Sequence, residues 1–221
     1  MFRLALPSDR DGIISLWQEV FGDPPAEVRR FFERFPDCLS YVTEDVTAMV
    51  HALPRVLSPA LPAAYLYAVA TRQDCRGQGL CGGLLAYAEA DLRQRGFACA
   101  VLAPAEPSLF RFYGKLGYET AFFGGHTAFD GGTPIGLSDY LRQREALLQC
   151  PHLICDRRLL EYARQLYGLT FYQTETGIAA VSETDTVERL PEDLIGGSTA
   201  MLKWLGRPLP LESAYLGFSL A

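Results

Sequence analysis

An apolar strand that runs into a glycine turn and then a helix constrains the fold of this chain more than any other feature. The apolar run covers 64–71, and the turn reads Arg76-Gly77-Gln78-Gly79-Leu80-Cys81-Gly82. A nearly continuous apolar run is typical of a central strand with both faces covered. A glycine turn that opens a helix presents unpaired backbone N–H groups, which bind an anion such as a diphosphate. The sequence therefore predicts an α/β protein with an anion-binding turn after a central strand.

The segment after the turn is predicted to form a helix, a strand and a short helix. Apolar residues recur at three- and four-residue steps from Leu84 to Leu92, and Gly96 ends this helix. A short buried strand follows at 98–103, and Pro107 begins a second helix that Gly117 ends. A strand, a helix and a parallel strand form a right-handed crossover in almost all proteins.

The segments before the central strand fit the same class. We expect a strand at 2–6, helices at 8–22 and 24–35, and a hairpin of strands at 39–43 and 47–57. The second helix carries aromatic residues at helical spacing, which is typical of a core or of a cleft wall.

Beyond Gly124 the pattern changes, and a second, smaller α/β unit is expected. Its predicted helices cover 138–148, 159–167 and 194–205, and its predicted strands cover 169–173 and 177–182. The sequence thus predicts two domains, 1–125 and 126–221, and the order of elements in the second faintly echoes the first.

Composition narrows the classes of partner. The formal net charge of -6 argues against nucleic acid and anionic membranes as partners, and it favours a cationic small substrate. Pro59 and Pro62 interrupt the longest weakly charged stretch, so no membrane helix is expected. The first residues lack the apolar core of a signal peptide, which favours the cytoplasm.

The six cysteines form no C-x-x-C pair, and we expect free thiols and no metal site. Cys75 and Cys81 lie in or beside the glycine turn, where the backbone is the more useful part, so neither is expected to form a covalent acyl-enzyme.

The turn and the segment around it resemble the GNAT superfamily of acyl-CoA-dependent N-acetyltransferases. The family signature is Arg or Gln, two residues, Gly, one residue, then Gly or Ala, and this chain departs from it only at Cys81. The run Phe112-Tyr113-Gly114-Lys115-Leu116-Gly117-Tyr118 is similar to the Eis-type branch, of which this chain resembles a short form. The resemblance covers the first half of the chain and implies a GNAT-type mixed sheet flanked by helices, with a smaller C-terminal α/β extension that could be a partial GNAT-like unit.

The resemblance implies acetyl-CoA as co-substrate and assigns the residues that bind it. The pantetheine arm would pair with the backbone of Val69, Ala70 and Thr71. The diphosphate would lie on the glycine turn, formed by Arg76, Gly77, Gln78, Gly79, Leu80, Cys81 and Gly82. Ser108 would lie near the pantetheine or nucleotide end.

Tyr113 is the predicted general acid, by its match to the family tyrosine and by its chemistry. A phenol with a pKa of about 10 can protonate a departing thiolate whose thiol pKa is about 8.5. The resemblance to Eis-type enzymes implies that the carboxylate of Ala221 is the base. The residues alone leave other candidates open, namely Glu44, Asp45, His51, Glu119 and His126.

The resulting prediction is an N-acetyltransferase that moves an acetyl group from acetyl-CoA to a primary amine in a direct ternary complex. The acceptor could be an aminoglycoside-like polyamine, a smaller amine or a peptide amine, and a homo-oligomer is compatible with this prediction. The alternative is a non-catalytic acyl-CoA-binding or protein-interaction module with the same fold.

Overall fold

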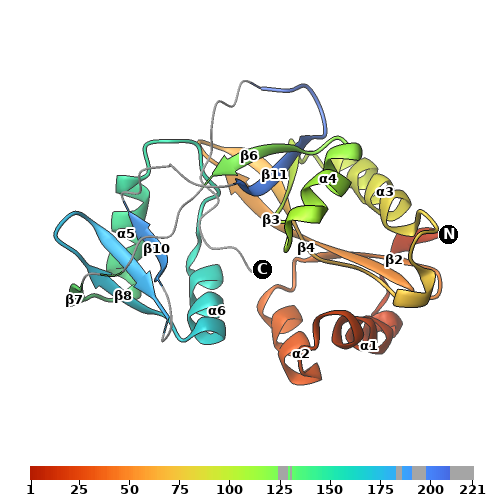
Figure 1. Ribbon diagram of the computed structural model, residues 1–221, viewed down its shortest axis with the longest axis horizontal. Helices are drawn as coiled ribbons and strands as arrows, with labels where there is room; N and C mark the ends of the chain where they lie inside the picture. The colour runs from red at the N-terminus through yellow and green to blue at the C-terminus, as the bar shows by residue number, and fades with distance from the viewer. Residues whose placement is uncertain (124–128, 130, 183–185, 191–197, 210–221) are drawn as a thin grey trace.

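The computed structural model describes residues 1–123, 129, 131–182, 186–190 and 198–209 (Figure 1). A seven-stranded sheet has the order β1-β2-β3-β4-β5-β11-β6, and a four-stranded sheet has the order β10-β9-β8-β7. The strands are β1 (Phe2–Leu4), β2 (Leu39–Thr43), β3 (Ala48–Leu57), β4 (Leu61–Thr71), β5 (Cys99–Leu102), β6 (Glu119–Phe123), β7 (Thr133–Pro134), β8 (Thr170–Gln173), β9 (Ile178–Val181), β10 (Thr186–Leu190) and β11 (Ser198–Trp204). The α-helices are α1 (Arg10–Phe21), α2 (Pro25–Arg34), α3 (Leu80–Gln94), α4 (Pro107–Lys115), α5 (Leu137–Leu147) and α6 (Arg157–Tyr167), with 3₁₀-helices η1 (Pro7–Asp9) and η2 (Gln73–Cys75).

Helices cover both faces of the large sheet. α1 and α2 lie on one face, and α3 and α4 lie on the other (Figure 1). In the large sheet β4 and β5 are parallel, whereas the other pairs are antiparallel. The predicted α/β class, with a large mixed sheet flanked by helices, is confirmed.

The two faces of the large sheet carry separate hydrophobic cores. Leu84 and Leu85 of α3 pack with Leu66 of β4 in the smaller core. Trp17 and Phe31 belong to the larger core, which continues through α6 into the four-stranded sheet. The larger core is therefore shared between one face of the large sheet, α6 and the four-stranded sheet, whereas the smaller core belongs to the other face of the large sheet.

The second unit is an insertion rather than a C-terminal extension. β11 follows it in sequence but lies in the large sheet, between β5 and β6. The expected helix at 194–205 is wrong for 198–204, which form β11, and the division of the chain into 1–125 and 126–221 does not follow the sheets at this point. Ala200, Met201 and Leu202 are consecutive buried residues, and such a short apolar run does not distinguish a buried strand from a helix.

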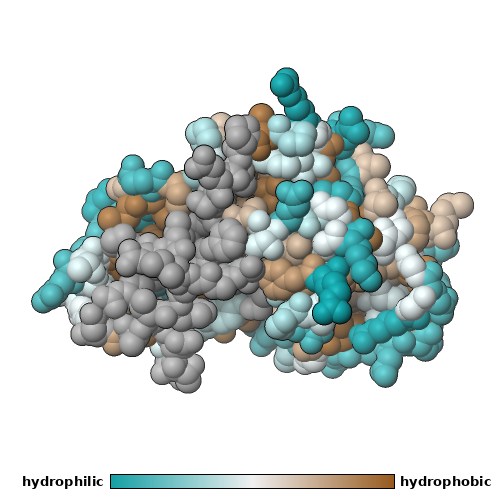
Figure 2. All heavy atoms as spheres, turned by 45° about the horizontal axis from the view of Figure 1, so that its top comes forward, coloured by the Kyte–Doolittle hydropathy of each residue, from teal (hydrophilic) through white to brown (hydrophobic). Residues whose placement is uncertain are grey.

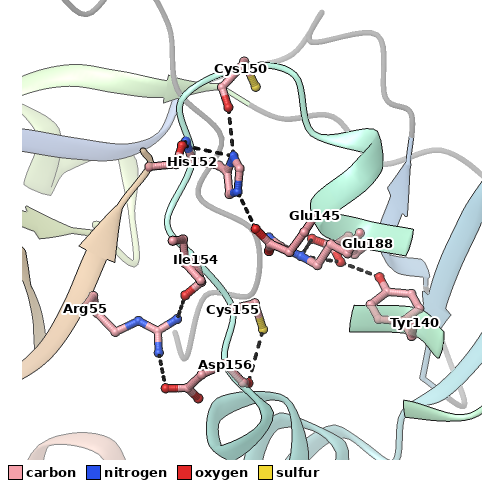
Figure 3. A network of polar contacts seen from close by, with 11 residues as sticks. Arg55, Tyr140, Glu145, Cys150, His152, Ile154, Cys155, Asp156 and Glu188 are labelled. Carbon is pink, nitrogen blue, oxygen red and sulfur yellow. Dashed lines mark hydrogen bonds and ion pairs between the residues drawn. The ribbon is translucent and has the colours of Figure 1, made fainter. Parts of the chain in front are cut away.

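A loop between α5 and α6 joins the insertion to the end of β3. Leu57 of β3 forms an isolated bridge with Leu153, and Ser58 N donates to the carbonyl of His152 at 2.8 Å. Arg55 points from β3 toward this loop, where it donates to the carbonyl of Ile154 and lies 3.6 Å from Asp156 (Figure 3). These contacts fix the start of α6 against the large sheet.

Charged side chains inside the insertion are paired with one another. Arg144 of α5 is fully buried, and its Nε lies 3.1 Å from Oε1 of Glu188 in β10. Tyr140 also donates its hydroxyl to Glu188, and Glu145 lies 2.9 Å from Nε2 of His152 (Figure 3). A buried charge is costly without such partners, so this network fixes α5 against β10 and against the joining loop.

On the face drawn in Figure 2, hydrophobic residues appear between hydrophilic ones rather than as one continuous belt. Among the described helices, none is both long enough and apolar enough to cross a membrane.

Two glycines inside helices test the packing of the large sheet. A Cβ at Gly83 would lie 2.6 Å from Cζ of Phe2, whereas a Cβ at Gly114 would meet nothing within 4 Å. We expect Gly83→Ala to lower the free energy of unfolding by about 1–3 kcal/mol, because overpacking forces β1 away from α3. Gly114→Ala is the control and should be neutral or stabilising by up to about 1 kcal/mol. Urea unfolding of both variants measures this, and equal effects would contradict the packing described.

Candidate active site

The central parallel strands separate and leave a pocket between them. β4 pairs with β5 only from Ala63 to Tyr65, and β5 ends one residue after its last pair, at Leu102, whereas β4 runs on to Thr71. A pocket of about 420 Å³ opens at this point, lined on one side by residues 65–69 of β4 and on the other by residues 102–105, which begin at the last residue of β5. The volume is within the ordinary range for small-molecule sites.

A β-bulge lies where β4 leaves β5. Met49 pairs with Ala70 and His51 pairs with Tyr67, so Val50 alone faces both Ala68 and Val69. Ala68 has φ 48°, a left-handed conformation that is strained for a residue with a side chain. Bulges bend a strand and re-aim its side chains, and they are common next to active sites.

The residues predicted to pair with a pantetheine arm lie at this free edge. Val69 lines the pocket, Ala70 is buried, and Thr71 ends β4. Within the described residues, the buried Oγ1 of Thr71 has no hydrogen-bond partner. Backbone groups on the free side of β4 suit a ligand that carries amides, as the pantetheine arm does.

The glycine turn has the geometry of an anion site. Gly77 and Gly79 have φ 76° and 77°, and a Cβ at either position would meet no atom within 4 Å. The first backbone bond of α3 runs from Gly83 N to Gly79 O, so the amides of residues 80–82 have no partner within the helix. Free amides and the positive end of the helix dipole suit a diphosphate.

The side chains of the turn hold its shape. Arg76 Nε donates to the carbonyl of Thr71 at 3.1 Å, which ties the turn to the end of β4. Gln78 Nε2 donates to the carbonyl of Asp74 at 3.4 Å. Cys81 is in the first turn of α3, where burial raises the pKa of its thiol to about 11. A thiol with this pKa is a poor nucleophile at neutral pH.

Tyr113 lines the same pocket from α4. Its side chain is buried, and its ring lies 5.8 Å from the ring of Tyr118. Burial, followed by the nearby Cys81, raises the pKa of Tyr113 above its ordinary value, so the phenol stays protonated at neutral pH. No hydrogen bond to the Tyr113 hydroxyl is found within the described part of the chain. The structure thus brings Tyr113, Val69 and the end of β4 together.

Ser108 is not brought into the pocket. It is exposed at the start of α4, and its hydroxyl donates to Glu106 at 3.0 Å. Its neighbour Leu109 lines the pocket instead.

A buried carboxylate supports the elements around Tyr113. Glu89 of α3 accepts from the Tyr118 hydroxyl at 2.8 Å and from Lys203 of β11 at 2.6 Å. Because Tyr118 packs against Tyr113, these bonds connect α3 and β11 to the wall of the pocket.

None of the described base candidates from the sequence lines the pocket. Glu44 lies 3.6 Å from Arg3, Asp45 accepts from Thr47 at 2.9 Å, and Glu119 is exposed on β6. The other two, His126 and the carboxylate of Ala221, lie outside the described residues.

His51 is instead a core residue. It is fully buried, its ring stacks on Trp17 at 5.1 Å, and its Nδ1 lies 2.8 Å from the Ser40 hydroxyl. Burial, with a smaller contribution from Arg10, lowers its pKa to about 3. This neutral imidazole, enclosed by aromatic rings, does not line the pocket.

The carboxylates that do line the pocket were missed in the sequence. Asp23 lies between α1 and α2 and accepts from Trp17 Nε1 at 2.8 Å, and Glu27 lies in the first turn of α2. One sequence feature could have identified these two carboxylates. Both lie at the start of a helix whose aromatic residues already indicated a core or a cleft wall. The opposite wall, from Tyr162 to Tyr167 of α6, carried no such signal.

The sequence matches the profile of the acetyltransferase (GNAT) domain over residues 1–121. The chain belongs to this GNAT family. The Eis-type branch within it stays a prediction. No curated protein matches the sequence.

Solved structures resemble this GNAT protein beyond the matched domain. A GCN5-related N-acetyltransferase from Anabaena variabilis is 15% identical, with 93% of this chain and 73% of that chain covered, at a TM-score of 0.64. A conserved protein from Enterococcus faecalis, described as a probable N-acyltransferase, is 19% identical at a TM-score of 0.60, with 84% of this chain and 52% of that chain covered. A GCN5-related N-acetyltransferase from Kribbella flavida is 21% identical at a TM-score of 0.57, with 84% and 55% covered. This chain spans about half the length of the last two proteins, and at these identities the likeness shows the fold alone.

The environment of His51 predicts acid sensitivity of the fold. The unfolded chain takes up a proton at His51 below pH 6.5, whereas the folded chain does so only near pH 3. The free energy of unfolding should therefore fall as pH drops below 6.5, by up to about 1.4 kcal/mol per pH unit from this group. In His51→Gln this contribution is absent, and the fall should be shallower by that amount. Urea unfolding at pH 7, 6 and 5 measures it, and identical slopes would rule out the described burial.

Proposed function

We propose that this protein transfers an acetyl group from acetyl-CoA to the primary amine of a small cationic molecule, in a direct ternary complex. The observation that carries the proposal is the position of Tyr113, a protonated phenol in the pocket where β4 and β5 separate. The glycine turn begins at the end of the same β4.

This geometry supports the following assignment of the residues that bind acetyl-CoA. The amides of residues 80–82 and the left-handed turn at Gly77 and Gly79 would hold the diphosphate. The free edge of β4 up to Thr71 would take the amides of the pantetheine arm. The thioester then enters the pocket from the side of Tyr113.

The chemistry needs a neutral amine and a protonated leaving group. The amine loses a proton to a carboxylate, directly or through water, and Asp23 and Glu27 are the carboxylates that line the pocket. The amine nitrogen then attacks the thioester carbonyl, the new C–N bond forms, and the C–S bond breaks. Tyr113 gives its proton to the departing sulfur, and the new amide nitrogen loses its second proton through water to the Tyr113 phenolate, which restores the phenol. Bringing the two reactants together supplies much of the rate enhancement.

Direct transfer is supported by the composition of the pocket wall. Among the described residues that line it there is no cysteine, serine or lysine to carry an acyl group.

The Eis-type branch, the cytoplasmic location, peptide acceptors and a homo-oligomer stay predictions.

The glycine turn can be tested with two glycines of the same conformation. Gly79 and Gly96 flank the two ends of α3, with φ 77° and 88°, and neither has an atom within 4 Å of a built Cβ. Gly79→Glu and Gly96→Glu therefore carry a similar strain of about 1–2 kcal/mol. Only the carboxylate at position 79 would repel the diphosphate. We expect calorimetry to show loss of acetyl-CoA affinity by more than about 100-fold in Gly79→Glu and little change in Gly96→Glu. Equal affinities in the two variants would exclude this turn as the site.

The acid role of Tyr113 can be separated from binding. Tyr113→Phe should bind acetyl-CoA as the wild type does and lose about 10²–10⁴-fold in turnover, because thiolate departure is no longer assisted. Tyr87→Phe removes a half-exposed phenol on α3 and serves as the control. Release of free thiol with an accepted amine measures turnover, and a Tyr113→Phe rate within threefold of the wild type would remove Tyr113 from the mechanism.

A further inference from the structure

The pocket continues beyond the reaction centre into an aromatic half. This half lies between α1 and α2 on one side and α6 of the insertion on the other, and it is lined by Trp17, Phe31, Tyr67, Tyr162 and Tyr167. Asp23 and Glu27 are the charged residues among the described lining, and both are acidic. A ligand in this half would contact aromatic rings on several sides and the negative charge of Asp23 and Glu27 at one end.

The aromatic rings form a packed set rather than isolated contacts. The ring of Trp17 lies 5.2 Å from that of Phe31 and 5.5 Å from that of Tyr67. The ring of Phe31 lies 6.1 Å from that of Tyr162, which joins α2 to α6. Two ion pairs reinforce the same junction, from Arg34 to Glu161 and from Arg158 to Asp37. The aromatic wall is therefore preformed in the absence of a ligand.

Within the described part of the chain neither Asp23 nor Glu27 forms an ion pair, although Trp17 Nε1 donates to Asp23 at 2.8 Å. The arginines at the junction, Arg34 and Arg158, are bound to other carboxylates. Arg30 of α2 is exposed and does not line the pocket. Both carboxylates are only partly exposed, which strengthens their attraction for a cation relative to bulk water.

We propose that the acceptor is a monoamine with an apolar, preferably aromatic, body. Its ammonium group lies at Asp23 and Glu27, and its body lies against the aromatic half of the pocket. This inference rests on the proposed function, because it names the acceptor class of that same site. Ring faces attract a cation and also bury an apolar body, so both parts of such an amine are matched.

The same wall disfavours a polyhydroxylated polyamine. The lining offers its many hydroxyl groups a few phenol hydroxyls and otherwise aromatic carbon, and each ligand hydroxyl buried without a partner costs about 1–3 kcal/mol. The pocket of about 420 Å³ also has to hold the acyl end of acetyl-CoA. An aminoglycoside-like acceptor, one of the classes left open by the sequence, therefore fits this pocket poorly.

The test is calorimetric titration of four probes into the full chain, with and without coenzyme A. 2-Phenylethylamine carries the ring and the charge, ethanolamine lacks the ring, 2-phenylethanol lacks the charge, and kanamycin is a polyhydroxylated polycation. We expect 2-phenylethylamine to bind at least tenfold more tightly than each of the others. Equal or tighter binding of ethanolamine or kanamycin would overturn the proposal.

Two pairs of variants localise the binding. Glu27→Gln should weaken 2-phenylethylamine binding by about tenfold, whereas Glu33→Gln, at an exposed position of the same helix, should leave it unchanged. Leu166 lines the pocket with a 40% exposed side chain, so Leu166→Arg should fold and should repel the ammonium group. Leu6→Arg is the exposed control outside the pocket. Unchanged binding in both pocket variants would contradict the proposed position.

Failure of this inference is distinguishable from failure of the proposed function. If acetyl-CoA binds and only hydrophilic amines release thiol, the acceptor class is wrong and the acetyl transfer stands. If 2-phenylethylamine binds as expected but acetyl-CoA does not, the pocket assignment stands and the acetyl transfer falls.

Discussion

The separation of β4 from β5 after Tyr65 is the constraint on which the site depends. A parallel ladder that ends in the middle of a sheet leaves backbone groups of β4 without a strand partner, and it opens space between the two strands. The bulge at Ala68 bends β4 at the same place, and the end of that strand leads into the glycine turn. The free edge and the pocket are thus consequences of one local disruption of pairing, and the same strand leads to the free amides at the start of α3.

The pocket has two halves that are built by different parts of the chain. The half around Tyr113 comes from β4, α4 and the segment after β5. The Glu89 carboxylate stabilises this half by accepting hydrogen bonds from Tyr118 and Lys203. The aromatic half comes from α1 and α2 together with α6 of the insertion. The proposed co-substrate and the proposed acceptor would therefore meet where these parts touch, and each would be held by a different set of contacts.

The sequence predicted those parts of the fold that depend on short runs of neighbouring residues. The central strand, the glycine turn and the helix that carries Tyr113 could be predicted because each is defined by a few neighbouring residues with strong conformational preferences. β11 was not, because its buried residues are apolar on both faces and its partners β5 and β6 are far away in sequence. Asp23 and Glu27 were missed for a related reason, since a carboxylate at a helix start is ordinary until a distant strand and α6 enclose it.

The place where the insertion leaves and re-enters the large sheet has a topological consequence. Phe123 at the end of β6 and Ser198 at the start of β11 are register partners on adjacent antiparallel strands. Adjacent antiparallel strands are normally joined by a turn of a few residues, so the whole second unit occupies the position of a hairpin loop. A unit attached in this way can be exchanged or shortened without breaking the order of the sheet. The pocket wall on α6 is therefore the part of the pocket that can change most freely among relatives while the sheet and the glycine turn stay the same.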